Sequence, residues 1–389
     1  MLARLFRCHL PDPASFNVPP ARILMSVLSL AWKNFPASSL HLDSHLAHTW
    51  NTLNACRGDL PILTAEAVVA ALQTFGTGTE RLLVGTANGA TVAMFVLEPQ
   101  AKFRWQTFQP SQLPLGTWVA ASDYALTDIV YSLQRGPLGL CLVLSITQVD
   151  PLYAPRPDDA ANTSSADYIE TGWIDVVGNF EDYWNARGKN LRQNMRKQRN
   201  KLGTEGVALA MDTWTAVEDM APAIARYGAL ESQGWKAAKG TAIHLDNEQG
   251  KFYRKLFETA AQRGEAVIYE YRFGDKTVAV NLCVRRASTL VILKTTYDES
   301  IQAYSPAFML SQDAMENLYA AGKTARVEYY GRLMEWHTKW TDQKRTLYHL
   351  TAYRWPLVKQ VALARRAKVE ATSPQEPATQ VTSAASPSA

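Results

Sequence analysis

The chain has 389 residues, of which 47% are hydrophobic and 20% charged, with 40 basic and 36 acidic side chains. This length exceeds the size at which a single hydrophobic core usually stops growing, so we expect two domains. The formal net charge of +4 is too small to require a nucleic acid or a membrane surface as partner.

The cysteines and the apolar runs predict a cytoplasmic protein without a membrane span. Cys8, Cys56, Cys141 and Cys283 are scattered, with no C-x-x-C pair and no histidine nearby at metal-ligand spacing. The longest apolar run, residues 23–32, is too short to cross a bilayer. Met25 lies inside this run and is an alternative start of translation.

Residues 1–40 are dotted with prolines and form an N-terminal extension of uncertain structure. Next, His41, His45 and His48 recur at i, i+4 and i+7, which would place them on one face of a helix. Such a face could hold zinc, but no further ligand follows at a useful spacing, and the intervening leucines favour ordinary packing. We therefore expect no metal.

Five elements are predicted in the first half of the chain. Thr64 is a helix N-cap, and Asn88-Gly89 is a strong turn signal between two apolar strands. The elements are a helix from Thr64, a hairpin over 81–99, a strand over 103–108, a helix over 118–133 and a strand over 138–146.

The second half repeats this order of hairpin, strand, polar loop, helix and strand, at an offset of roughly 185 to 190 residues, which indicates an internal duplication. Its elements are a strand over 207–214, helices over 217–233 and 248–263, a hairpin over 266–284 that turns at Gly274-Asp275, a strand over 290–297, a helix from Phe308 and a strand over 325–331. Chance similarity between two β-rich halves is the alternative explanation.

A basic segment joins the two halves. The sequence of residues 179–203 predicts a linker helix with aromatic residues at its start. They are followed by seven basic residues with no acidic residue among them: Arg187, Lys189, Arg192, Arg196, Lys197, Arg199 and Lys201. Such a helix could meet the phosphates of a cofactor or of RNA, or it could be a solvated linker. Residues 370–389 are rich in Pro, Ser, Thr and Ala and predict a disordered tail.

The most informative stretch is 289–322, where an apolar strand leads through a polar loop to a helix that opens at Ser305-Pro306 and stops at Gly322. Ser before Pro is a typical N-cap, and a first-turn proline costs the helix no hydrogen bond. The unpaired backbone N–H groups at such a helix start attract phosphate. An ordinary crossover between a strand and a helix would have the same sequence pattern.

Three motifs carry a resemblance to a known family. They are ESQGWKAAKG at 231–240, LKTTYDESIQAYSPAFML at 293–310, and VEYYGR followed by WHTKW at 327–340. With the element order of 206–355, they resemble the GNAT superfamily of N-acyltransferases, and within it the bacterial acyltransferase family associated with cellulose biosynthesis, a relative of the Fem peptidyltransferases.

The resemblance implies an α/β (α+β) fold of tandem GNAT-like repeats, each a mixed, mostly antiparallel sheet flanked by helices. The repeats would be a degenerate one over 41–178 and an acyltransferase domain over 204–369. The co-substrate would be acyl-CoA, held without a metal, and the acceptor would be a small-molecule or glycan-linked amine of an envelope polysaccharide pathway.

The resemblance also assigns roles to residues. The acyl-CoA would pair with the backbone of Leu293, Thr295 and Thr296, and its pyrophosphate would meet the N–H groups of Ser305, Ala307, Phe308 and Met309. Glu328 would be the general base and Tyr330 the acid for the thiolate, and the two would share a strand face. Glu231, Trp235 and Lys236 would line the acceptor side.

The chain departs from the family pattern at two places. Ala307 replaces a glycine after Ser-Pro, and Trp336-His337 replaces Tyr-Lys. His337 is an alternative base. Two other functions stay open at this point: an aminoacyl-tRNA-dependent transferase like the Fem relatives, favoured by the basic linker, and a non-catalytic binding module, favoured by the two departures.

Overall fold

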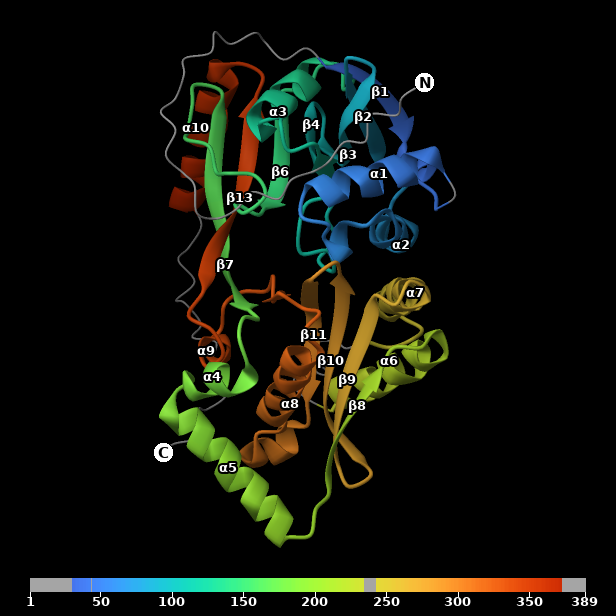
Figure 1. The fold of residues 1–389 in the computed structure, drawn as a ribbon. Coiled ribbons are helices and arrows are strands. Elements are labelled where there is room, and N and C mark those ends of the chain that lie inside the picture. The colour runs from blue at the N-terminus through green and yellow to red at the C-terminus, as the bar shows by residue number, and fades with distance from the viewer. Residues whose placement is uncertain (1–29, 43, 234–242, 373–389) are drawn as a thin grey trace.

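The computed structural model describes residues 30–42, 44–233 and 243–372, with side chains up to residue 366. The chain forms two halves that share one succession of elements: a strand, two helices, three strands, a helix and two strands (Figure 1). The first half has one further short strand before its last helix, and the second half has one further short helix between its last two strands. The predicted duplication is therefore visible as a tandem repeat of secondary structure.

The first repeat contains seven strands and three helices among its described residues. The strands are β1 (Ala31–Pro36), β2 (Arg81–Ala87), β3 (Ala90–Ala101), β4 (Arg104–Thr107), β5 (Trp118–Ala120), β6 (Val143–Val149) and β7 (Thr163–Asp175). The helices are α1 (His45–Cys56), α2 (Ala65–Phe75) and α3 (Leu126–Arg135).

The second repeat follows two linking helices, α4 (Phe180–Asn185) and α5 (Lys189–Thr204). Its strands are β8 (Leu209–Trp214), β9 (Ala266–Phe273), β10 (Lys276–Arg286), β11 (Thr289–Tyr297), β12 (Arg326–Glu328) and β13 (Lys344–Tyr353). Its helices are α6 (Val217–Glu231), α7 (Glu248–Gln262), α8 (Pro306–Ala321) and α9 (Glu335–Thr338), and α10 (Pro356–Thr372) ends the described chain.

The strands form one mixed sheet in the order β1-β2-β3-β4-β6-β13-β7-β12-β11-β10-β9-β8, and β5 pairs with β3 outside this order. Counted from the two ends of the sheet, equivalent strands of the two repeats occupy equivalent positions. All neighbours pair antiparallel except β4 with β6 and β11 with β12, which are parallel. Each repeat therefore contributes one parallel pair at the equivalent position. This arrangement agrees with the predicted class of mixed, mostly antiparallel sheets flanked by helices.

The two repeats exchange a strand at the centre of this sheet. β7 follows β6 in the chain but pairs with β12, whereas β13 follows β12 but pairs with β6. β7 and β13 also pair with each other, as Figure 1 shows along the left side of the molecule. Each repeat thus contributes one strand to the sheet of the other repeat.

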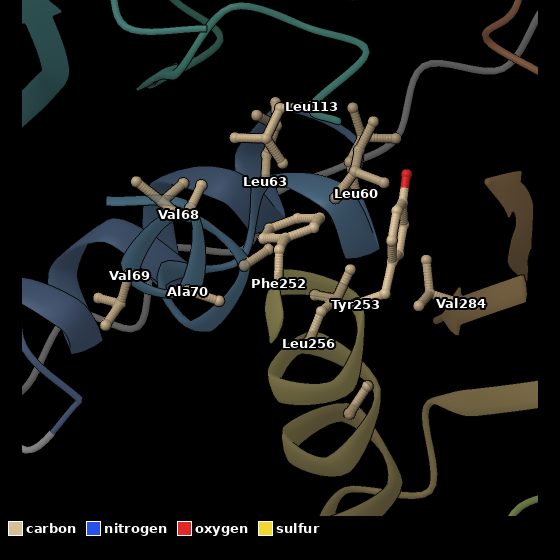
Figure 2. Packing of buried hydrophobic residues seen from close by; sticks show 14 of the residues in the cluster. Leu60, Leu63, Val68, Val69, Ala70, Leu113, Phe252, Tyr253, Leu256 and Val284 are labelled. Carbon is tan, nitrogen blue, oxygen red and sulfur yellow. The ribbon is translucent and has the colours of Figure 1, made fainter. Parts of the chain in front are cut away.

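A shared hydrophobic core joins the helices of the two repeats. Leu60, Leu63 and Val68 from the first repeat lie in one buried cluster with Phe252 and Tyr253 of α7 (Figure 2). The ring of Phe252 is fully buried, 5.4 Å from that of Phe75 on α2. Burial of large apolar side chains is the main favourable term in folding, so this contact stabilises both repeats together.

Local signals explain several element boundaries. The Thr64 side chain accepts a hydrogen bond from the N–H of Ala67 at 3.2 Å, as expected of an N-cap. Asn88 and Gly89 both have positive φ, 51° and 81°, which confirms the predicted tight turn of the hairpin. Gly322 ends α8 with a φ of 62°.

Some predicted boundaries are wrong. Residues 118–120 form strand β5 rather than the start of a helix, because they pair with 93–95 of β3, and α3 begins only at Leu126. Strand β1 lies within the predicted N-terminal extension, and α10 continues to Thr372 in the predicted tail. The rest of that tail, 373–389, lies outside the described residues, as do residues 1–29.

Candidate active site

Glu328, the predicted base, is the last residue of the short strand β12 and is fully buried. Its Oε2 accepts a hydrogen bond from Nη2 of Arg345 at 3.0 Å. Its Oε1 has no hydrogen-bond partner among the described residues, and Nη1 of Arg326 lies 3.9 Å away. One carboxylate oxygen is therefore held by a hydrogen bond, while the other has only the longer contact with Arg326.

The environment of Glu328 brings the pKa of its carboxyl group close to neutral pH. Burial raises its pKa from 4.5 to about 7; Arg345 opposes this rise, and the negative charge of Asp150 adds to it. A base is most effective when its pKa lies near the working pH. Perturbed pKa values of this kind gather at functional sites.

Tyr330 lies on the same side of the sheet as Glu328 and is 3% exposed. Its hydroxyl donates to Oδ2 of Asp150 at 3.1 Å, and its backbone has a φ of 49°. Burial next to Asp150 raises its pKa well above the usual value, so the phenol keeps its proton at neutral pH. The structure thus brings both predicted catalytic side chains into one buried polar cluster.

His337, the alternative base, is buried in packing instead. Its ring stacks on Trp336, with centroids 3.6 Å apart, and its Nδ1 accepts the N–H of Met334 at 2.8 Å. Burial lowers its pKa to about 4, which keeps it neutral under ordinary conditions.

The strand that the resemblance assigns to acyl-CoA has one open edge. β12 pairs with β11 over three residues only, up to the Val291–Glu328 pair, whereas β11 continues to Tyr297. Along that continuation, which contains Leu293, Thr295 and Thr296, β11 is paired with β10 on one side and with no described strand on the other. The carbonyl oxygen of Thr295 accepts the hydroxyl of Tyr227 at 3.3 Å.

A small cavity of about 20 Å³ lies where the two strands part, on the α8 side of the sheet. That space accommodates about one water molecule. The side chain of Asn281, which is 5% exposed, lines the cavity. The lining also includes Tyr269, Cys283, Ile292, Val327, Tyr329 and Trp340.

The start of α8 gives the predicted phosphate position a defined geometry. Ser305 is left-handed, with a φ of 55°, and its side chain does not cap the helix but accepts Nδ2 of Asn194 at 3.1 Å. The N–H of Ser305 donates to Gln302, and those of Phe308 and Met309 donate to the carbonyl of Ser305. Of the four predicted donors, three have acceptors within the described chain. The N–H of Ala307 has none there.

Glu231, predicted to line the acceptor side, is 3% exposed at the end of α6. Its Oε1 accepts the hydroxyl of Tyr227 at 3.1 Å, and its Oε2 accepts the N–H of Ile243 at 2.8 Å. It therefore joins α6 to the residue where the described chain resumes. The other two predicted acceptor residues, Trp235 and Lys236, lie outside the described residues.

The first repeat has no counterpart to the open edge of β11. The equivalent strand, β4, is only four residues long, and the chain then enters a loop in which Phe108, Leu113 and Leu115 are buried. A Cβ on Gly116 would lie 2.4 Å from the carbonyl oxygen of Thr147, which shows how closely this loop packs against the end of β6. In the first repeat, a packed loop thus takes the place of the strand continuation that β11 has in the second repeat.

Sequence reasoning missed two charged residues of the site, Asp150 and Arg345. Asp150 follows β6, and Arg345 lies on β13, a strand that was not predicted. They are 195 positions apart in the chain, so no local motif joins them. Among the described residues, no group of three or more His, Cys, Asp or Glu side chains is placed to hold a metal ion, and no described helix is long and apolar enough to cross a membrane.

Comparisons with known proteins show what this part of the chain is similar to. Residues 189–338 match the family described as an acetyltransferase (GNAT) domain. No curated protein matches the sequence significantly. The matched region runs from α5 to α9, so this part of the chain is similar to a GNAT acetyltransferase domain, which supports a transferase.

Two solved structures support the fold over nearly the whole chain. FemX superposes with a TM-score of 0.54 at 9% identity, over 85% of this chain and 99% of that one. The C-terminal domain of a protein from Agrobacterium fabrum, assigned as a lysylphosphatidylglycerol synthetase, gives a TM-score of 0.50 at 13% identity, over 82% and 96%. At such identities the likeness shows the fold alone.

Proposed function

We propose that this chain is an acyl-CoA-dependent N-acyltransferase whose acceptor amine attacks the thioester directly. The observation that carries the proposal is the parting of β11 from β12 at Glu328. The free edge of β11 then runs toward the start of α8, so one end of an extended thioester would lie near a general base and the other near a helix N-terminus. Oε1 of Glu328, which accepts no hydrogen bond from the described residues, is the group that such a substrate would engage.

The reaction needs two proton transfers, and the cluster contains a group for each. Glu328 takes one proton from the acceptor ammonium, which frees the lone pair on nitrogen for attack on the carbonyl carbon. The C–N bond forms, the C–S bond breaks, and the nitrogen loses its second proton. Tyr330 supplies a proton to the departing thiolate and regains one from solvent or from the new amide nitrogen.

The narrower proposals concern the acceptor and the setting. The three motifs that resemble the cellulose-associated acyltransferase family support a glycan-linked or small-molecule amine, with Glu231, Trp235 and Lys236 on the acceptor side. A cytoplasmic setting is supported by the buried thiols of Cys141 and Cys283, which form no disulfide within the part of the chain that the structure describes.

Calorimetric titration of the whole chain with acetyl-CoA tests the proposal. We expect binding that is weakened about tenfold or more by Ala307→Glu, because a carboxylate at the start of α8 would repel the pyrophosphate. The matched control is Ala320→Glu, which puts the same charge on an exposed residue near the other end of α8. The absence of binding to the wild type, or equal losses in both variants, would count against the proposal.

An aminoacyl-tRNA donor is the second candidate, and α5 favours it. Lys189, Arg196 and Lys197 are exposed on this helix, while Asn194 of the same helix reaches Ser305 at the start of α8. A row of exposed cations beside the proposed donor site suits a polyanionic donor.

Filter binding of a short hairpin RNA at rising salt distinguishes this candidate. An RNA donor requires affinity that falls steeply with salt and a smaller salt slope after Arg196→Gln with Lys197→Gln. Lys102→Gln with Lys323→Gln removes the same charge from exposed positions elsewhere. Salt-independent binding, or none, would remove the RNA donor and leave the CoA donor in place.

A further inference from the structure

We propose that Asp150, a residue of the first repeat, positions the general base of the second repeat by sharing the guanidinium of Arg345 with Glu328. The inference rests on the proposed function of Glu328 as the base. It assigns the first repeat a part in the chemistry of the second repeat.

The shared guanidinium is visible in the hydrogen bonds of Arg345. Its Nε donates to Oδ1 of Asp150 at 2.8 Å, and its Nη2 donates to Oδ2 at 2.6 Å. The same Nη2 also donates to Oε2 of Glu328 at 3.0 Å. The bonds to Asp150 form a bidentate pair, whereas Glu328 receives a single longer bond. Asp150 thus fixes the plane of the Arg345 guanidinium, and the guanidinium in turn orients the carboxylate of Glu328 through its single hydrogen bond.

Asp150 is itself held rigidly. It is fully buried directly after β6, next to the register position where Val149 pairs with Tyr348 of β13. Its Oδ1 accepts the N–H of Leu152 at 3.0 Å, and its Oδ2 accepts the hydroxyl of Tyr330 at 3.1 Å. A side chain with this many partners cannot rotate freely, so it can define the position of a group that it binds.

The strand exchange places Asp150 and Glu328 around Arg345. β13 lies between β6, which leads to Asp150, and β7, which pairs with β12 and so with Glu328. Arg345 pairs with Thr171 of β7, and its guanidinium lies 5.0 Å from the ring centroid of Trp173 on the same strand. An arginine on the exchanged strand therefore reaches one carboxylate from each repeat.

The charges around Glu328 predict what Asp150 does to its acidity. Glu328 is faced by Arg345 from β13, by Asp150 from the end of β6, by Arg326 from its own strand, and by the hydroxyls of Tyr330 and Tyr153. Arg326 is engaged by Asp175 at 2.9 Å. Asp150 is also faced by the buried guanidinium of Arg57, at the end of α1. The negative charge of Asp150 raises the pKa of Glu328, whereas Arg345, which binds Asp150 through two hydrogen bonds and Glu328 through one, lowers it.

Replacement of Asp150 by Asn should therefore release Arg345 to Glu328. Asp150→Asn keeps the shape of the side chain and removes its charge, so Glu328 becomes the sole carboxylate partner of a buried guanidinium. The expected result is a fall of about one pH unit or more in the pKa of Glu328. The acid limb of kcat/KM against pH should move lower by the same amount, with an unchanged affinity for acetyl-CoA.

The direct readout is carbon NMR of the whole protein labelled on glutamate side chains, with Glu328→Gln identifying the resonance. This titration follows Glu328 whether or not the protein acylates any amine, so failure of the inference and failure of the proposed function give different results. Asp158→Asn, at an exposed position nearby in the chain, is the control for charge alone and should leave the titration unchanged.

Should Asp150→Asn not fold, Arg345→Lys decides the question, because lysine keeps the charge but cannot bridge two carboxylates in a fixed plane. In that variant we expect the pKa of Glu328 to rise, since it loses its hydrogen bond. A Glu328 titration that stays at the wild-type position in the folded variants would overturn the proposal. A shifted titration without any acylation activity would support the positioning role and refute the proposed function.

Discussion

At the scale of single residues, Tyr330 explains why the site opens where it does. Its φ of 49° lies in a region that bulky residues rarely adopt, and such strain persists only where the surroundings hold it. Here the hydroxyl bond to Asp150 and the burial of the ring hold it. The left-handed turn leads the chain away two residues after Glu328, so β12 ends while β11 continues. The left-handed conformation of Tyr330 thus lies directly after the point where the edge of β11 loses its strand partner.

The raised pKa of Glu328 also predicts a pH effect on stability. Its pKa is about 7 in the folded chain, whereas an ordinary glutamate, as in the unfolded chain, has a pKa of 4.5. Between these pH values the folded state therefore binds more protons than the unfolded state. Stability contributed by Glu328 is present below pH 4.5 and is lost as the pH rises toward 7. Glu328→Gln should abolish this loss, which amounts to at most about 1.4 kcal/mol per pH unit.

Urea unfolding at several pH values between 4.5 and 7.5 measures this difference. The comparison must be between variant and wild type, because His337, with its pKa lowered to about 4, contributes the opposite slope. Glu316→Gln, on the exposed side of α8, is the matched control and should retain the wild-type slope. Parallel curves for wild type and Glu328→Gln would show that the carboxyl group titrates at its ordinary pKa.

At the scale of elements, the sequence predicts those segments whose signal is local. The Ser305-Pro306 start and Gly322 end of α8, and the Asn88-Gly89 turn, depend on backbone conformations of a few adjacent residues. The prediction failed at Trp118, because pairing with β3 overrides the local helical pattern.

The exchanged strands escaped prediction for a related reason. β7 is polar over much of its length and partly exposed, so it lacks the apolar run of a buried strand. Its partners, β12 and β13, lie more than a hundred residues away in the chain. Glu328 and Tyr330 could be singled out from the sequence, whereas Asp150 and Arg345 meet them only through this exchange.

At the scale of the whole molecule, the exchange and the common core predict that the two repeats unfold together. Neither repeat can complete its sheet alone, and the cluster that contains Leu63 and Phe252 draws on both (Figure 2). Independent domains would need separate cores and few connections between them. A local loss of packing between α2 and α7 should therefore lower the stability of the entire chain.

Phe252→Ala tests this coupling. Phe252 is fully buried against Phe75 of the first repeat, so its truncation should cost about 3–5 kcal/mol. Circular dichroism and tryptophan fluorescence in urea should still give one coincident transition, at lower denaturant than in the wild type. Phe103→Ala, at a side chain that is 37% exposed, should change the midpoint little. If the variant instead showed two separate transitions, the repeats would be independent folding units, and Asp150 could lose contact with Glu328 without global unfolding.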